Sequence, residues 1–287
     1  MLLLALLLQS AAPASEPPPL PPLHGGPMEK ECPVGGETYS VWVVGSYSTY
    51  GARPDGRPYS YVRFPFPIAE CPSNKLVVFD EFSPEEVTKL QALIESAEYK
   101  ALVAKESAYY RGSWLAARIG RSEGESLGLL LSAIWTVTPS WDSTPATEAS
   151  REKFRSYQNE FVERAKRLST ETPPLERVWM QARATNALRQ MGEFSAAEAM
   201  RRAAEASLAS APDMGWGSYL SELKIVIDRK DSSVEPLDMV PTNQRDLICT
   251  YGTIEGDFNK SVCAQPEVVN RVAELRKMRE QAIQSAK

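Results

Sequence analysis

The stretches ECPVGGE (residues 31–37) and ECPSN (residues 70–74) decide the fold of the amino-terminal part of the chain. Each has the form of half a zinc knuckle, because a structural zinc ribbon takes four ligands from two paired CxxC motifs. Gly35 and Asn74 stand where the second cysteine of each motif would be, and neither residue supplies a thiolate. The sequence therefore predicts a zinc-ribbon-like module without a metal ion, and we expect no cofactor.

A disulfide bond between the two half-knuckles is the expected replacement for the metal. In a tetrahedral thiolate site, neighbouring sulfur atoms lie only about 3.8 Å apart, so little movement closes a bond of ~2.05 Å. We expect Cys32 to pair with Cys71, closing a loop worth on the order of 4 kcal/mol. Cys249 and Cys263 would close a shorter loop worth about 3 kcal/mol. Four cysteines allow three connectivities, so the other pairings stay open.

Three stretches carry a resemblance to a known family: ECPVGGETY (31–39), GSYSTYGARPDGRPYSYVRFPFPIAECP (45–72) and LVVFDEFSPEEV (76–87). They resemble a bacterial family of uncharacterised proteins, in which a CPxCG…CPxCG rubredoxin-like β module precedes tetratricopeptide-like helices. The resemblance covers roughly residues 30–105, with weaker support to about residue 210. It implies a fold and no activity, and the departures at Gly35 and Asn74 remove the basis for metal binding.

Composition and charge exclude several classes of function. The chain has 287 residues, of which 43% are hydrophobic, and a net charge of −5. An acidic chain lacks the basic footprint of a nucleic-acid-binding protein, and no apolar run after residue 8 approaches the roughly 20 residues of a membrane span. The single histidine, His24, lies in a proline-rich stretch, which removes His-dependent nucleophiles and zinc hydrolase motifs.

The amino terminus has the pattern of an export signal. A short apolar run, Leu2 to Leu8, precedes an A-x-A site at residues 12–14, so we expect a signal peptide over 1–14 and a periplasmic or secreted protein. No Lys or Arg precedes the leucines, and a cytosolic protein with a misassigned start is the alternative. Residues 15–29 form a proline-rich linker of polyproline type.

The remaining chain predicts an α+β fold that is predominantly α. Residues 30–82 form the degenerate rubredoxin-like β module, with strands at 38–44 and 75–79 and a tight turn at Arg53–Arg57. Residues 83–230 form a helical, tetratricopeptide-like domain, and residues 231–287 a loop followed by a helix that begins at Pro266. Helical periodicity within the middle domain predicts helices at 108–119, 125–137, 151–168, 175–191 and 195–209.

The start of the helical domain has the clearest local signal. Ser83 is an N-cap, Pro84 suits the first helical position and Glu86 completes a capping box. The apolar stripe from Val87 to Leu102 predicts one continuous helix. Near the end of the domain, residues 219–229 fit either a short helix or a strand.

One polar-aromatic cluster is the candidate binding surface. As an anion or glycan surface it would use guanidinium contacts and ring stacking; as a structural hairpin it would pack tyrosines over arginine stems. Trp216 is either exposed for binding or packed as a capping residue. The candidate residues are Arg53, Arg57, Tyr59, Tyr61, Arg63 and Trp216.

These features favour an exported protein-interaction or scaffold protein that binds a protein or peptide partner and no nucleic acid. Helical repeats build extended binding surfaces, and we assign no catalytic residues. The alternatives are a carboxylate-based enzyme, which needs two carboxyl groups about 5–9.5 Å apart, and a carbohydrate-binding envelope protein.

Overall fold

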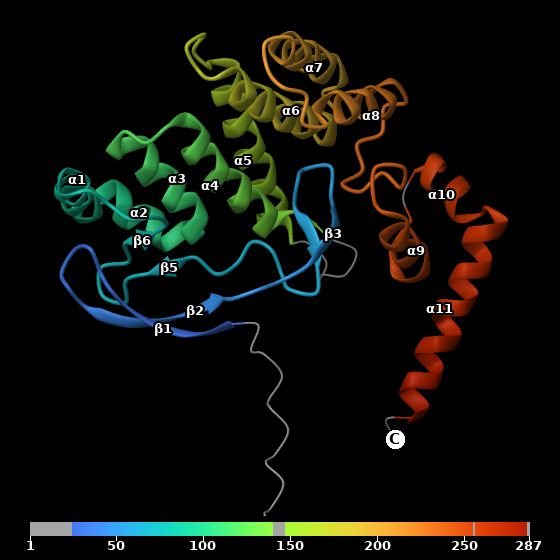
Figure 1. Cartoon of the computed structure of the whole chain (residues 1–287), viewed down its shortest axis with the longest axis horizontal. Helices are drawn as coiled ribbons and strands as arrows, with labels where there is room; N and C mark the ends of the chain where they lie inside the picture. The colour runs from blue at the N-terminus through green and yellow to red at the C-terminus, as the bar shows by residue number, and fades with distance from the viewer. Residues whose placement is uncertain (1–24, 140–146, 255, 286–287) are drawn as a thin grey trace, which may run out of the picture.

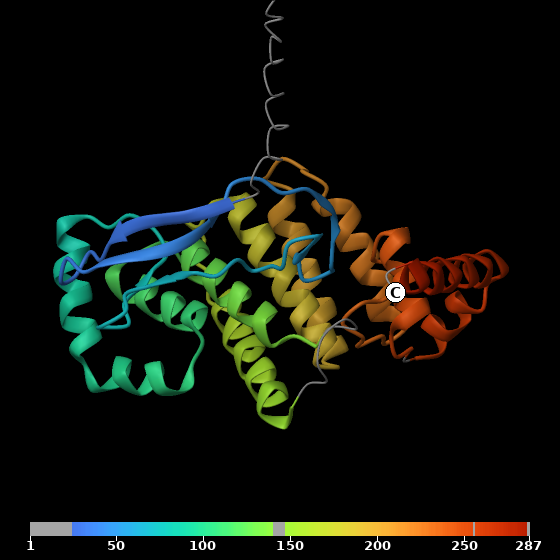
Figure 2. The ribbon, with the colours of Figure 1, turned by 90° about the horizontal axis from the view of Figure 1, so that it is seen from below.

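A computed structural model describes residues 25–139, 147–254 and 256–285. The fold is α+β and predominantly α, as predicted. The predicted signal peptide and most of the proline-rich linker lie outside the described residues. Figures 1 and 2 show the strands along one side of the helices α1–α5, and the last three helices at the opposite end of the molecule.

The amino-terminal module consists of three antiparallel strand pairs rather than one sheet. In the longest pair, Gly25 lies opposite Val44 and Glu31 opposite Thr38. The strand predicted at 75–79 is only two residues long. It begins at Val77 rather than Lys75, because Lys75 has a left-handed φ of 60° and the Leu76 carbonyl accepts from the Cys71 N–H. The pairs are β1 (Gly25–Glu31) with β2 (Thr38–Val44), β3 (Thr49–Ala52) with β4 (Pro58–Ser60), and β5 (Ala69–Glu70) with β6 (Val77–Val78).

Two loops of the same form face each other in this module, and we call them knuckle 1 (residues 32–37) and knuckle 2 (residues 71–76). In each knuckle the cysteine N–H donates to the carbonyl five residues on, at 2.9 Å, and the cysteine carbonyl accepts from the residue four on, at 3.1 Å. Gly36 and Lys75 take left-handed φ values of 66° and 60° at the same position. Cys32 and Cys71 form a disulfide bond with a Cα–Cα distance of 5.8 Å, which confirms the first predicted pairing.

The helix predicted from Pro84 to Leu102 is instead two helices, α1 (Pro84–Glu95) and α2 (Ala97–Lys105). Ser96 separates them with an extended ψ of 149°. Its hydroxyl donates to the Leu93 carbonyl at 2.6 Å and accepts from the Tyr99 N–H at 3.1 Å. Ser96 thus ends one helix and caps the next, and the chain turns so that both helices contact the module. The predicted capping box at Ser83 is confirmed.

The middle of the chain forms helices that pack as successive antiparallel neighbours. Small buried residues at Ala184, Ala197 and Ala204 bring α6 and α7 together. The segment 219–229, predicted as helix or strand, is helical up to Asp228, and Arg229 is the C-cap. The helices are α3 (Ala108–Ile119), α4 (Glu123–Val137), α5 (Glu148–Lys166), α6 (Pro174–Gln190), α7 (Phe194–Leu208) and α8 (Trp216–Asp228).

The carboxy-terminal unit has more structure than the predicted loop and helix. Two further helices, α9 (Thr242–Tyr251) and α10 (Asp257–Cys263), occupy the predicted loop, and Cys249 and Cys263 join them by a disulfide bond with a Cα–Cα distance of 5.5 Å. The last helix, α11 (Pro266–Ser285), packs against α9.

The described residues were also compared with what a membrane-spanning helix and a metal site require. None of their helices has the length and apolar character needed to cross a membrane. Among the same residues, no three His, Cys, Asp or Glu side chains are grouped closely enough to hold a metal ion.

Candidate functional site

The site is built on the turn between β3 and β4. Gly56 donates to the Arg53 carbonyl at 2.8 Å, and the Arg53 N–H donates to the Arg57 carbonyl at 2.9 Å. Asp55 accepts from the Arg57 N–H at 3.1 Å, and Gly56 has a φ of 87° that favours glycine. The predicted turn is thus confirmed, and it holds two arginines next to each other.

Helices α4, α6 and α8 hold the tip of this hairpin. The Pro54 carbonyl accepts from Arg183 Nη1 at 2.6 Å and from the Tyr219 hydroxyl. Trp135 donates to the Asp55 carbonyl at 3.3 Å. A Cβ atom on Gly56 would lie 2.7 Å from the guanidinium carbon of Arg183. The surface of the helical domain that we expected to be open for a partner is therefore occupied here by the chain's own hairpin.

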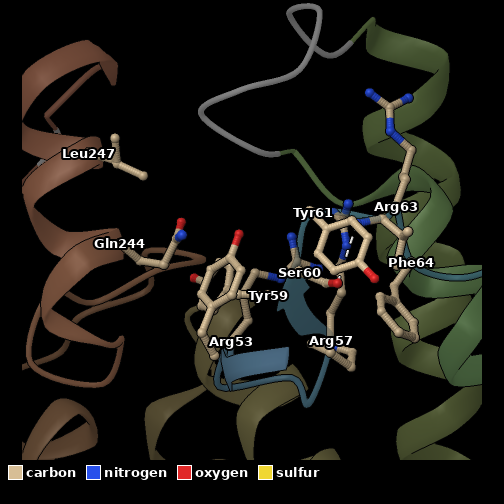
Figure 3. A pocket seen from close by; sticks show the side chains of 12 residues that line it. Arg53, Arg57, Tyr59, Ser60, Tyr61, Arg63, Phe64, Gln244 and Leu247 are labelled. Carbon is tan, nitrogen blue, oxygen red and sulfur yellow. Dashed lines mark hydrogen bonds between the residues drawn. The ribbon is translucent and has the colours of Figure 1, made fainter. Parts of the chain in front are cut away.

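The docked hairpin and α9 enclose a cavity of about 350 Å³, which we call the aromatic–basic pocket (Figure 3). The hairpin and the segment after it supply most of the wall, and Gln244 and Leu247 of α9 close the other side. None of the lining residues in the described part of the chain is a carboxylate. They are Tyr50, Arg53, Arg57, Pro58, Tyr59, Ser60, Tyr61, Val62, Arg63, Phe64, Gln244 and Leu247.

Arg53 is the buried charge of the pocket, with 3% of its surface exposed. Its Nε and Nη2 donate to the two Asp55 carboxylate oxygens at 3.1 and 2.5 Å. Burial is the largest single influence and would lower the pKa of Arg53, but Asp55, Glu235 and Tyr59 together raise that pKa above its ordinary value. Its Nη1 is buried without a hydrogen-bond partner. The arginine is therefore charged and fixed, with one side of its guanidinium unused.

Tyr59 joins the hairpin to the segment before α9. Its hydroxyl donates to Glu235 Oε1 at 2.6 Å. Burial raises the pKa of Tyr59, and the Glu235 carboxylate adds to this effect. The phenol therefore stays neutral, and its O–H remains the donor in the hydrogen bond to Glu235. The ring lies parallel to that of Tyr50, with centroids 6.4 Å apart and an interplanar angle of 12°. The pocket thus has a flat aromatic wall beside its arginines.

Five of the six predicted surface residues line this one pocket. Tyr61 and Arg63 are exposed, and Arg57 and Tyr59 are half-buried. The prediction that Arg53 lies on the surface is wrong, because its bond to Asp55 holds it inside the turn. Trp216 does not line the pocket.

Trp216 packs on the other side of the hairpin tip. Its ring lies edge-on to that of Tyr219 at 5.8 Å, and the Arg183 guanidinium lies 5.3 Å from its centroid. Its role as a packed residue, the second interpretation from the sequence, fits this position.

Sequence reasoning missed Glu235, Gln244 and Leu247. Glu235 lies 176 positions from Tyr59, with which it forms a hydrogen bond. All three residues belong to a segment predicted as loop, and Gln244 and Leu247 line the pocket opposite the hairpin. Gln244 carries no signal of its own, although it is 4% exposed at the start of α9. The helical spacing of Gln244, Leu247 and Ile248 is the one pattern that could have indicated the helix.

Comparison of the chain with protein-family models, with curated proteins and with solved structures finds no match. The functional argument therefore rests on the chemistry of this pocket.

Proposed function

We propose that the chain is an exported protein-interaction or scaffold protein, which binds a protein or peptide partner at the aromatic–basic pocket. The observation that carries the proposal is the composition of the pocket. Three arginines and three tyrosines line it, and no described carboxylate does. Arginine and tyrosine are the side chains that most often dominate the energy of protein interfaces.

Export is supported by the state of the cysteines. Both pairs are bonded and none of the four is a free thiol. Disulfide bonds persist in the periplasm and outside the cell, and are rare in the cytosol. Together with the apolar run at residues 2–8, they favour a periplasmic or secreted location.

Descent from a metal-binding module is supported by the two knuckles. They share the same pair of hydrogen bonds and the same left-handed position. A built Cβ atom on Gly35 would lie 3.8 Å from Asn74 Nδ2, so the two positions that lack cysteine face each other. We therefore retain the resemblance to the rubredoxin-like family as a proposal about origin.

Binding is favoured over carboxylate catalysis by the positions of the acids. Burial raises the pKa of Glu222, and the charge of Asp238 adds to the effect. Glu222 does not line the pocket, and Asp238 is held by Arg229 through contacts of 2.5 and 2.7 Å. A glycosidase needs an acid and a second carboxyl group across a cleft, which this pair does not supply.

Carbohydrate binding remains the second candidate because of one observation. Tyr50 and Tyr59 stack at 6.4 Å, and Tyr50 is 43% exposed. An exposed aromatic face next to arginines also suits a sugar ring, so the experiment must separate a protein partner from a glycan.

Photocrosslinking in living cells tests the proposal. A photoreactive phenylalanine analogue replaces Tyr61, which lies at the pocket and is 57% exposed, or Tyr251, which is 37% exposed on α9 and does not line it. We expect the Tyr61 position to crosslink to an exported protein, and the Tyr251 position not to yield that product. Two results together would contradict the proposal. The Tyr61 position would give glycan adducts or no adduct at all, and the purified protein would bind to a panel of glycans.

A further inference from the structure

Exposed aromatic side chains gather in one part of the amino-terminal module. Of the five aromatic side chains that are exposed in the described part of the chain, four lie within residues 42–61. One of them, Tyr47, is 46% exposed, and its ring centroid lies 5.2 Å from that of Phe64 and 5.1 Å from that of Phe66. We call these three residues the aromatic patch. Apolar surface of this kind marks an interaction site when it is contiguous and open to solvent.

The backbone beneath the aromatic patch is held in place. The Phe66 carbonyl accepts from the Tyr109 hydroxyl of α3 at 2.7 Å, and the Ser60 hydroxyl donates to the Ser48 carbonyl at 2.7 Å. Phe64 also lines the aromatic–basic pocket, on the side away from α9 (Figure 3). The patch is therefore a preformed surface, which loses little conformational freedom when a ligand binds.

The chain that precedes β1 joins the structure beside this patch. Because β1 and β2 run antiparallel, Gly25 lies opposite Val44, and Figure 2 shows the two strands side by side up to this end. Tyr47 follows Val44 by three residues, which span about 10 Å when extended. Pro22 precedes Gly25 by the same three residues. The residues before β1 can therefore reach the aromatic patch without a long connection.

The composition of these preceding residues suits an aromatic surface. Residues 17–23 read PPPLPPL, with five prolines, two leucines and no charge. Such a sequence favours the polyproline II conformation, which forms no internal hydrogen bonds. Aromatic-lined surfaces recognise polyproline II segments because the preformed helix loses little entropy on binding. Residues 17–23 thus have the chemistry that fits the patch, as well as the position.

We propose that residues 17–23 dock on the aromatic patch of the same chain, as a polyproline II segment whose proline and leucine side chains contact Tyr47, Phe64 and Phe66. This inference goes beyond the proposed function and does not depend on it. Because Phe64 is shared with the aromatic–basic pocket, the docked segment lies at the edge of that pocket.

Photocrosslinking of the purified full chain in dilute solution tests the docking. A photoreactive phenylalanine analogue replaces Tyr47, and we expect it to link, within one chain, to a peptide that contains residues 17–23. The analogue at Tyr251, which is 37% exposed on α9, is the matched control and should not give this product. Replacement of the five prolines in residues 17–23 by serine should abolish the product at position 47.

Two results of the crosslinking would overturn the inference. Absence of any link between position 47 and residues 17–23 would show that the segment does not occupy the patch. Links only between two chains, detected as a product of doubled mass, would show that the patch binds the segment of a second copy instead of its own.

A fluorescent peptide of residues 15–24 provides a measurement that leaves the patch unchanged. In the full chain the tethered segment competes with this peptide at an effective concentration of millimolar order. By anisotropy, we therefore expect the wild-type chain to bind the peptide about tenfold more weakly than the five-serine variant does. Equal affinities for the two chains would overturn the inference.

Two further substitutions in the five-serine variant locate the peptide. Tyr47→Ala changes an exposed residue, so the fold should be retained, which circular dichroism checks, and we expect a several-fold loss of peptide affinity. Tyr251→Ala removes an exposed tyrosine outside the patch and should leave the affinity unchanged. If the two substitutions behave alike, the aromatic patch is not the docking site.

Discussion

The amino-terminal module and the carboxy-terminal unit of α9–α11 each contain one disulfide bond, but the bonds lie in different surroundings. Cys32 and Cys71 are 2% and 0% exposed, and their core continues into α1, α2 and α3 through Leu90, Tyr99 and Leu115. Cys249 and Cys263 are half-buried, beside a core that, among the described residues, has three buried apolar members: Leu237, Ile248 and Val262. The Cys32–Cys71 bond thus lies in a core that the module shares with the helices. The Cys249–Cys263 bond stabilises a unit whose own apolar core is small.

Other contacts reinforce this difference. The Tyr99 hydroxyl donates to the Lys75 carbonyl at 2.6 Å, and Arg111 donates to the same carbonyl at 2.9 Å. Knuckle 2 is thus fixed to the helices by polar bonds as well as by packing. From residue 276 to residue 285, in contrast, every residue of α11 is exposed. We infer that the amino-terminal module unfolds together with the helices and that the carboxy-terminal unit can open alone.

Removal of the first disulfide should have the largest effect. The double variant Cys32→Ala with Cys71→Ala opens a loop of 39 residues, which costs about 4 kcal/mol in the chain-entropy model. We expect the amino-terminal module and helices α1–α8 to unfold together in one urea transition, with a free energy of unfolding lower by this amount. A separate early transition for the module would contradict the shared core.

Removal of the second disulfide should have a smaller and more local effect. The double variant Cys249→Ala with Cys263→Ala opens a loop of 14 residues, worth about 3 kcal/mol. Amide hydrogen exchange should become faster in α9 and α10 while α3–α8 keep their protection. If exchange rises equally in α6 and α7, the unit does not open alone.

Asn74 tests how much of the module depends on bonds other than the disulfide. Its side chain donates to the Val34 carbonyl at 2.8 Å and accepts from the Leu76 N–H at 2.9 Å, so it links the two knuckles. Asn74→Ala should cost about 1–2 kcal/mol of unfolding free energy in urea. Asn74→Asp keeps the acceptor oxygen and loses the N–H donor. Its loss of unfolding free energy should therefore be smaller than that of Asn74→Ala. Equal losses for the two variants would contradict the role of the acceptor.

Deletion of the chain from Glu280 onwards should have the smallest effect. The described residues that it removes are all exposed, and surface changes away from such contacts usually stay within about 0.5 kcal/mol. We expect an unchanged midpoint in urea and a slightly weaker helical circular-dichroism signal. A clear loss of stability would show that the end of α11 packs on the rest of the protein.

Comparison of the sequence predictions with the structure shows which parts of the fold can be predicted. Local hydrogen bonds set the turn at Pro54–Gly56 and the capping box at Ser83, and both are confirmed. The break at Ser96 was missed, because the apolar stripe continues through it and the serine hydroxyl can serve either a helix interior or a cap. Helices α9 and α10 were missed because they are short and bury few apolar residues.

The candidate site was predictable only in part, for a related reason. Arg57, Tyr59, Tyr61 and Arg63 are neighbours in sequence, so their hairpin brings them together. The burial of Arg53 depends on its bond to Asp55 and on the docking of the turn against α4, α6 and α8. The opposite wall of the pocket is supplied by α9. The position of this helix is set by packing between segments that are distant in the sequence, so no local pattern predicts it.

Peptide mapping of the protein under non-reducing conditions tests the central claim most directly, namely that oxidised sulfur holds the two knuckles together. Protein isolated without added reductant should yield two linked peptides, one joining Cys32 to Cys71 and the other joining Cys249 to Cys263. Free thiols at Cys32 and Cys71, or zinc or iron bound in stoichiometric amount, would contradict the account.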